Sequence, residues 1–116
     1  MSALRKPDLA AMRERAEDAS QLMKTLGNPQ RLRILCLLGG RELSVGQINE
    51  ELPDLSQSAL SQHLAKLRDE GLVHTRREAQ TIWYTLATGP AERIITTLYG
   101  IYCESGSDSA RKPASR

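Results

Sequence analysis

The side chains best suited to covalent chemistry in this sequence are two cysteines, Cys36 and Cys103, which are the only thiols among its 116 residues. Thiol exchange requires a thiolate, access and a nearby second thiol that resolves the product. The two residues therefore provide the components of a redox pair. The alternative is that each is a small buried hydrophobe, which is what a free cysteine most often is. This alternative is strongest for Cys36, which lies within an apolar helix face.

A thiol–disulfide enzyme is a separate possibility, and the spacing of the cysteines argues against it. Such enzymes place a C-x-x-C pair near a βαβ pattern, and this chain contains neither. Measurable turnover of a dithiol substrate would be needed to revive this interpretation. The sequence therefore predicts that the protein is not an enzyme, and it gives no reason to expect a cofactor.

Short polar side chains form a second candidate site, on one face of a helix predicted between Ser56 and Gly71. Ser56 is placed to cap this helix, and Leu60, Leu64 and Leu67 recur at the spacing of a buried stripe. The opposite face lacks the Glu and Lys side chains that usually solvate a helix and carries Ser58, Ser61, Gln62, Ala65 and Asp69. A face of this kind can closely approach base edges in a DNA major groove.

A β-hairpin is predicted directly after this helix. Gly71 is expected to end the helix in a left-handed conformation. Two strands then follow, over 72–77 and 81–86, on either side of a polar tip at 78–80. A helix followed by a basic hairpin is typical of a winged helix.

Four further helices are expected around this unit. Their start signals are Asp8 before a helix over 9–26, Asn28-Pro29 before 30–38, Ser44 before 45–52, and Thr88-Gly89-Pro90 before a helix that reaches Cys103. The third and fourth helices, joined by a tight turn, predict a helix-turn-helix. The expected fold is therefore mainly α with a small β-hairpin, in a winged helix-turn-helix. Narrow apolar seams on the first and last helices indicate that these two build a dimer.

Length and composition fit one small domain, over 1–104, followed by a basic, Ser-rich tail over 105–116 that we expect to be disordered. A net charge of +2 is too small to identify a nucleic-acid binder by itself. The absence of Phe argues against a stacking platform for single-stranded nucleic acid. The N-terminal residues contain no signal-peptide core, and the longest apolar run, 34–38, is too short to cross a bilayer. We therefore expect a cytoplasmic protein.

Four stretches of the sequence resemble the ArsR-type winged-helix repressors: NPQRLRIL, ELSVGQI, LSQSALSQHLAKLRDEGLV and the hairpin end IWYTL. The resemblance covers residues 22–86, and the Ser-Gln-Ser-x-x-Ser run before His-Leu-x-x-Leu is its most specific part. It implies a homodimer that binds double-stranded operator DNA as a repressor and releases it when an inducer arrives.

The family's base-reading positions fall on the polar helix face, at Gln57, Ser58, Ser61 and Gln62. The amide of Gln62 can bridge an adenine through two hydrogen bonds. The basic side chains better placed for phosphate, which sets register and salt dependence, are Lys66, Arg68, Arg76 and Arg77. The alternative for each of these residues is an ordinary solvated surface. His63 is ambiguous, because it can also pack against the preceding helical turn.

Metal sensing occurs in many members of this family, and this chain lacks the ligands for it. One family site uses a Cys-x-Cys-type motif at the third helix, where this chain has Leu43-Ser44-Val45-Gly46. Another uses His and carboxylates along the last helix, where this chain has only Glu92 and Glu104, near the ends. Two cysteines fall short of the four ligands of a tetrahedral site. We therefore expect no metal site.

The cysteine pair instead resembles that of the dithiol subgroup, which responds to persulfides and other reactive sulfur species and in some members to oxidants. The resemblance implies that a disulfide or short polysulfide bridge forms between Cys36 and Cys103 and weakens operator binding. A coupling of about 1–3 kcal/mol would lower the affinity about 5- to 150-fold. Peroxide is the alternative inducer, because the same two sulfur atoms would react.

Local sequence gives mixed indications of how the thiols are activated. Arg33, one turn before Cys36, is placed to favour a thiolate. A helix C-terminus and Glu104 both disfavour a negative charge on Cys103. Activation must therefore depend on the tertiary structure.

A winged helix used only to bind other proteins is the remaining functional class. It would show no salt-dependent affinity for DNA, whereas a repressor would show a steep dependence.

Overall fold

Six helical segments and three strands make up residues 7–104, the part of the chain that this computed structural model describes. In chain order they are α1 (Leu9–Leu26), α2 (Pro29–Leu37), β1 (Leu43–Ser44), α3 (Val45–Glu51), α4 (Gln57–Asp69), β2 (Val73–Glu78), β3 (Thr81–Leu86), α5 (Pro90–Tyr99) and the π-helical turn η1 (Gly100–Glu104). The tail predicted over 105–116 lies outside the described residues.

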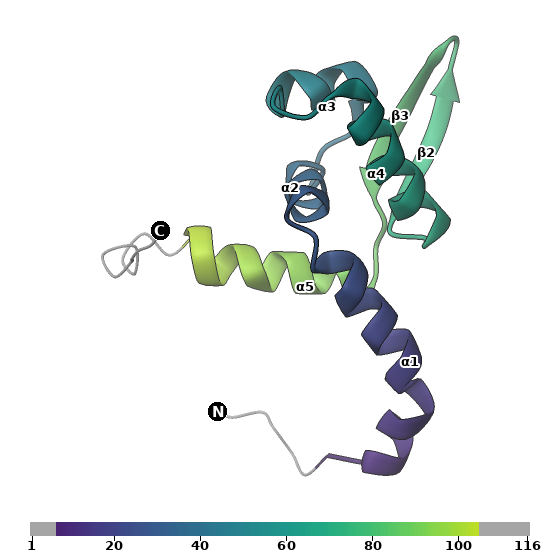
Figure 1. The fold of residues 1–116 in the computed structure, drawn as a ribbon, viewed down its shortest axis with the longest axis vertical. Coiled ribbons are helices and arrows are strands. Elements are labelled where there is room, and N and C mark those ends of the chain that lie inside the picture. The colour runs from purple at the N-terminus through teal and green to yellow at the C-terminus, as the bar shows by residue number, and fades with distance from the viewer. Residues whose placement is uncertain (1–6, 105–116) are drawn as a thin grey trace.

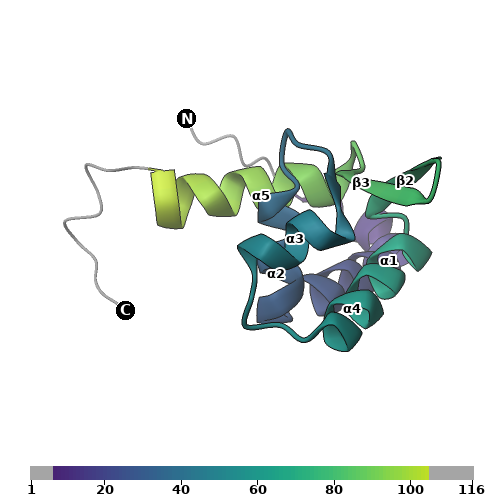
Figure 2. The same cartoon turned by 90° about the horizontal axis from the view of Figure 1, so that it is seen from above.

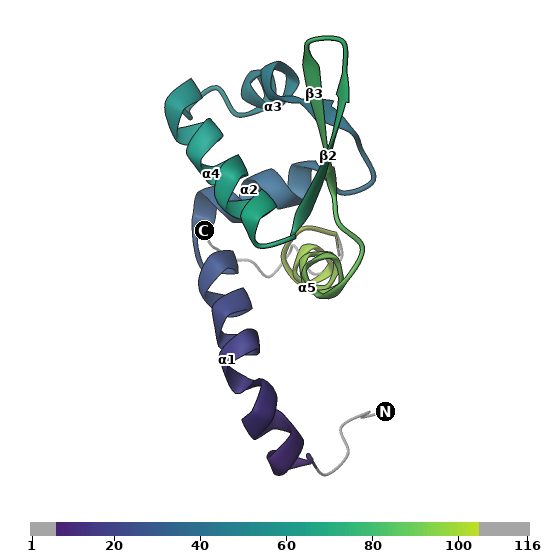
Figure 3. The same ribbon diagram turned by 90° about the vertical axis from the view of Figure 1, so that its right-hand side faces the viewer.

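Helices α2, α3 and α4 and the hairpin β2–β3 form the body of the molecule, from which two helices extend (Figure 1). Helix α1 runs away from the body on one side, and α5 leaves it in a different direction (Figures 2 and 3). The hairpin stands beside α4, at the opposite end of the molecule from α1 (Figure 3). This arrangement confirms the predicted winged helix-turn-helix and leaves α1 and α5 largely uncovered.

Side-chain caps start the first four helices where the sequence predicted them. Asp8 accepts a hydrogen bond from the Ala11 amide at 3.1 Å, and the Asn28 side chain accepts from two amides of α2 at 2.9 and 3.0 Å. Ser44 and Gln47 form a reciprocal capping box, with hydrogen bonds of 3.2 and 3.0 Å. These contacts satisfy backbone amides that have no partner within a helix.

The sheet contains one strand more than the predicted hairpin. β1 pairs antiparallel with β3, which gives the strand order β1-β3-β2. The hairpin tip is also shorter than expected, because Glu78 pairs with Thr81 and belongs to β2. The turn is therefore Ala79-Gln80, and Ala79 has a φ of 55°, a conformation that few residues other than glycine adopt.

The core lies where α2, α3, α4 and the first residue of β2 meet. Its fully buried side chains include Ile34, Leu35, Leu38, Ile48, Leu60, Leu64, Leu67 and Val73. All three leucines of the predicted α4 stripe are among them. Cys36 is exposed, so the alternative in which it is a small buried hydrophobe does not hold.

Large apolar side chains remain exposed mainly on the two extended helices. On α1 these are Leu9, Met12 and Met23, and at the end of α5 and in η1 they are Tyr99, Ile101 and Tyr102. Within residues 7–104, no helix combines the length and the apolar character needed to cross a membrane.

Candidate DNA-binding surface and thiol pair

The polar face of α4 is open to solvent along its whole length. All four predicted base-reading side chains are exposed: Gln57, Ser58, Ser61 and Gln62. Leu60, Leu64 and Leu67 are buried on the other side of the helix. The Ser56 hydroxyl accepts from the Ala59 amide at 3.0 Å and fixes where the helix begins. The helix thus rests on an apolar base and presents hydroxyl and amide groups outward.

Asn49 fixes the turn that joins α3 to α4. Its side-chain amide donates to the carbonyl oxygens of Leu52 and Leu55, at 3.3 and 3.0 Å. These bonds bridge the ends of the turn and so set the angle between the two helices. This role of Asn49, which lies four residues before Pro53, was not predicted, although Asn is a residue type enriched at turns.

Arg33 of α2 holds the same turn from the other side. Its guanidinium donates two hydrogen bonds to the Asp54 carboxylate, at 2.7 and 2.9 Å. Hydrogen bonds from Arg33 hold the pKa of the Asp54 carboxyl below its ordinary value. The positive charge of Arg33 is therefore committed to Asp54.

Arg76 of β2 is engaged by an acidic residue rather than free at the surface. It donates two hydrogen bonds to Glu42, at 2.7 and 2.8 Å, and one to Glu78 at 3.3 Å. Its guanidinium also lies over the Trp83 ring, 5.6 Å from the centroid. The hydrogen bonds from Arg76 hold the pKa of Glu42 below its ordinary value. Glu42 thus stabilises the wing through Arg76, a contact that no local sequence pattern predicted.

The other predicted phosphate ligands differ in whether an acidic side chain pairs with them. Lys66 pairs with Glu70 at 2.9 Å. Arg77 is exposed on the wing, and its guanidinium donates to the Ala79 carbonyl at 3.3 Å. Arg68 is exposed in the last turn of α4. Arg68 and Arg77 are therefore the members of this set that no acidic side chain engages within residues 7–104.

The two histidines do not gather with other metal ligands. His63 is half-buried, and burial, with a smaller contribution from the positive charge of Arg31, lowers its pKa. His74 is exposed on β2. Across residues 7–104, no three side chains of His, Cys, Asp or Glu form a group that could hold a metal ion.

Cys36 lies at a cavity of about 380 Å³ between the end of α2 and one side of α5. The cavity is lined by Cys36, Gly39, Gly40, Leu86, Glu92, Ile95, Thr96 and Tyr99. Partial burial at the cavity raises the pKa of the Cys36 thiol although the residue remains exposed on its other side, and the charge of Cys103 raises this pKa further. Both thiols are free and exposed.

The prediction that Arg33 activates Cys36 is wrong. The pKa of Cys36 is raised, and Arg33 is not among the groups that shift it. The physical reason is the bidentate ion pair between Arg33 and Asp54, because the Asp54 carboxylate neutralises the positive charge of Arg33.

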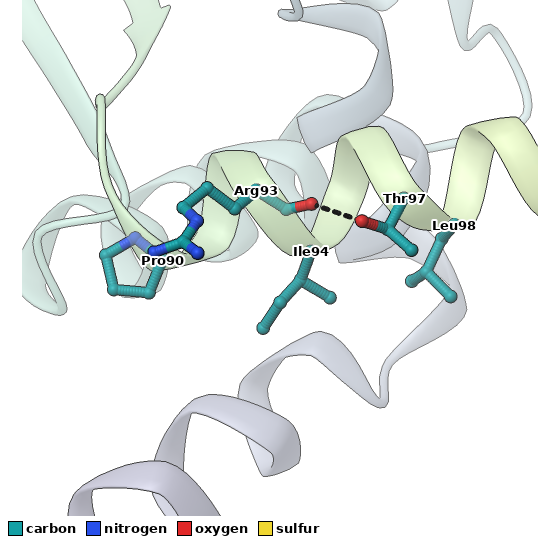
Figure 4. Close-up of a pocket in the computed structure, with 5 residues that line it drawn as sticks. All are labelled: Pro90, Arg93, Ile94, Thr97 and Leu98. Carbon is teal, nitrogen blue, oxygen red and sulfur yellow. Dashed lines mark hydrogen bonds between the residues drawn. The ribbon is translucent and has the colours of Figure 1, made fainter. Parts of the chain in front are cut away.

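A shallow cavity of about 370 Å³ lies on another side of α5 (Figure 4). Ile94 and Leu98 point from the same side of the helix, whereas the Thr97 hydroxyl turns back to donate to the Arg93 carbonyl at 2.9 Å. This side of α5 therefore presents mainly aliphatic surface, which suits packing against another helix better than catalysis.

Comparison with known proteins gives consistent matches. A family model for bacterial regulatory proteins of the arsR family matches residues 28–75. The transcriptional activator HlyU of Vibrio cholerae is 48% identical over 98 residues, which cover 84% of this chain and 90% of HlyU. The biofilm growth-associated repressor of Agrobacterium fabrum is 47% identical over 95 residues, which cover 82% of this chain and 80% of the repressor. The solved structure of reduced HlyU from Vibrio cholerae has a TM-score of 0.76 at 49% identity and covers 81% of this chain and 98% of that one.

Proposed function

The chain belongs to the arsR family of bacterial regulatory proteins, and we propose that it is a homodimeric, thiol-controlled repressor of transcription. The family and the named relatives are transcriptional regulators, which indicates a regulator rather than an enzyme. One close relative is named an activator and another a repressor. The repressor role is therefore a part of the proposal that has to be tested.

The exposed amide and hydroxyl face of α4 supports DNA binding most directly. A helix that buries three leucines and exposes Gln57, Ser61 and Gln62 can enter a major groove. Because these exposed side chains are uncharged, no charged group has to lose its water when the helix contacts the bases. Two such helices in a symmetric dimer would reach successive major grooves on one side of the duplex. The exposed apolar side chains of α1, α5 and η1 provide a surface for that dimer.

Cys36 and Cys103 are the proposed sensor. One thiolate attacks the outer sulfur of a persulfide RSSH, takes up that sulfur and releases RSH. The second thiol then attacks the inner sulfur of the resulting cysteine persulfide and releases H₂S, which leaves a disulfide. Two electrons pass from the protein thiols to the sulfur donor. A further RSSH inserts one more sulfur into the bridge and releases another RSH.

Formation of the bridge would tie α2 to η1, the turn that continues α5. Helix α2 packs against the recognition unit, whereas α5 carries apolar surface for the dimer. A covalent tie between them would favour a dimer whose recognition helices are poorly spaced for DNA. Support for this step comes from the exposure of both thiols and from the cavity that Cys36 shares with Ile95, Thr96 and Tyr99 of α5.

Intact mass read beside DNA affinity tests the proposal. The DNA is a duplex selected from a random pool by the reduced wild-type protein, and the treatments are inorganic polysulfide, diamide and hydrogen peroxide. We expect polysulfide to add mass in steps of about 32 Da per inserted sulfur and to weaken binding at least 5-fold. Loss of binding with peroxide alone would instead favour an oxidant sensor.

The matched variants are Cys36→Ser and Cys103→Ser. Each should bind the selected duplex like wild type when reduced and should keep that affinity after polysulfide treatment. If either variant still releases DNA, the thiol pair is not the sensor. If the reduced wild-type protein selects no sequence at all, the DNA-binding part of the proposal fails.

A further inference from the structure

Glu70 connects the end of α4 to α1. Its carboxylate accepts a hydrogen bond from the Thr25 hydroxyl at 2.5 Å and another from the Gln21 amide at 3.0 Å. Lys66, one turn back along α4, pairs with the same carboxylate at 2.9 Å. Within residues 7–104, Glu70 therefore accepts both side-chain hydrogen bonds that join α1 to the end of α4.

An acidic residue at this position is unfavourable by the rules of local structure. Glu70 is the C-cap of α4, where the helix dipole disfavours a negative charge. Burial also acts to raise its pKa, yet hydrogen bonds from Thr25, Lys66 and Gln21 outweigh burial and hold the pKa below its ordinary value. A residue that violates a local rule and is stabilised by tertiary partners is a candidate for a functional role.

Thr25 is the buried end of this connection. Its side chain is only 1% exposed, and Thr25 and Leu26 are the buried residues of α1. The carbonyl of Thr25 also accepts a hydrogen bond from Arg31 of α2 at 3.3 Å. The last turn of α1 is therefore fixed to the body, while the rest of the helix extends away from it (Figures 1 and 3).

We propose that Thr25 and Glu70 are positioning residues that set the angle between α1 and α4, and thereby the separation of the two recognition helices in the dimer. This inference rests on the proposed function, because it requires a dimer that uses α1. The 18 residues of α1 span about 27 Å at a rise of 1.5 Å per residue. A tilt of about 10° at its last turn therefore moves its far end by about 5 Å, a substantial part of the roughly 34 Å between half-sites on DNA.

Distances between the two α4 helices provide a test that needs no DNA. A nitroxide is attached at Ala65→Cys, an exposed position of α4, in the full chain with Cys36→Ser and Cys103→Ser, and double electron–electron resonance measures the distance across the dimer. We expect one narrow distance in this parent protein. Thr25→Val keeps the size of the side chain but removes its hydroxyl, and it should broaden the distribution or shift it by several ångströms.

Three further variants separate positioning from simple destabilisation. Thr25→Ser restores a hydroxyl and should restore the narrow distance. Glu70→Ala alters a partly exposed site and should reproduce the effect of Thr25→Val even if that variant folds poorly. Glu51→Ala removes an acidic residue that pairs with Arg41 at 3.9 Å, away from α1, and should change nothing.

The outcomes distinguish this inference from the proposed function. A dimer whose distance stays narrow and unchanged in both Thr25→Val and Glu70→Ala overturns the positioning role alone. Absence of any dipolar coupling in the parent protein, with a monomer in sedimentation, overturns the homodimer and this inference together.

Discussion

Arg76 and Glu42 form a two-pronged ion pair that crosses the sheet of the wing. Glu42 directly precedes β1 and Arg76 lies in β2, the two outer strands, so that the pair passes over β3 and the Trp83 ring. The carboxylate at 2.7 and 2.8 Å engages one edge of the guanidinium and offsets its positive charge. Arg76 is thus better suited to stiffen the wing than to bind phosphate, whereas no acidic side chain among residues 7–104 pairs with the neighbouring Arg77.

Salt dependence of DNA binding distinguishes these two arginines. Arg77→Ala should reduce the slope of log affinity against log salt by about 1 per protomer. The reason is that a protein with one phosphate contact fewer releases fewer counterions from the DNA when it binds. Arg76→Ala should change the slope less. Fluorescence anisotropy over a series of KCl concentrations measures both. The control is Arg15→Ala on α1, whose side chain is 77% exposed. Equal slopes for wild type and Arg77→Ala would show that Arg77 does not contact the backbone.

The polar face of α4 should carry sequence discrimination. Gln62→Ala and Ser61→Ala are each expected to cost about 1–3 kcal/mol of preference for the selected duplex. Affinity for random DNA should stay near the wild-type value, because these side chains are uncharged. Competition binding against the two duplexes measures the preference. Equal losses on both duplexes would indicate damage to the fold instead of lost base contacts.

Alkylation of Cys36 should be slow at neutral pH. Burial and the nearby Cys103 both disfavour its thiolate, so the alkylation rate should rise through a midpoint above the ordinary thiol value of about 8.5. Cys103→Ser removes one of the two causes and should move the midpoint downward. Arg33→Ala should leave it in place, because the charge of Arg33 is paired with Asp54. Iodoacetamide labelling followed by peptide mass analysis gives the profile, and a midpoint below 8.5 would contradict this account.

The capping box at the start of α3 should contribute measurably to stability. Ser44→Ala removes the acceptor for the Gln47 amide and should lower the free energy of unfolding by about 1 kcal/mol. Urea denaturation followed by circular dichroism measures this change. Ser44→Asp keeps an acceptor at the N-cap and serves as the control, with an expected stability near wild type. A fall of the same size in both variants would mean that the cap is not responsible.

Local features of the fold could be predicted because they depend on neighbours in sequence. Asp8, Asn28, Ser44 and Ser56 cap helices through amides two or three residues away, and the α4 leucines follow the helical period. Gly71 ends α4 with a φ of 75°, as expected. The strand β1 has only two residues, too few for an alternation pattern to identify its pairing with β3.

Tertiary partners could not be predicted, because a local pattern does not specify which distant residue is nearby. Glu42 meets Arg76 and Thr25 meets Glu70 across 34 and 45 residues of sequence, respectively. The exposure of Cys36 could not be predicted for the same reason, and its burial therefore stayed an open alternative. Leucines adjoin it on the helix surface, but whether a neighbouring element covers that strip depends on where α5 lies, and α5 leaves a cavity there.

The two thiols lie on either side of the DNA-reading unit in the chain, Cys36 in α2 before it and Cys103 in η1 after it. A bond between them would close a ring of about 70 residues and remove about 4 kcal/mol of chain entropy from the unfolded state. The bridged protein should therefore melt at a higher temperature than the reduced protein, whereas the proposed function expects it to bind DNA more weakly. Such a regulator would be more stable against unfolding in its oxidised, inactive form than in its reduced form. Recovery of repression would then depend on reduction of the bridge rather than on synthesis of new protein.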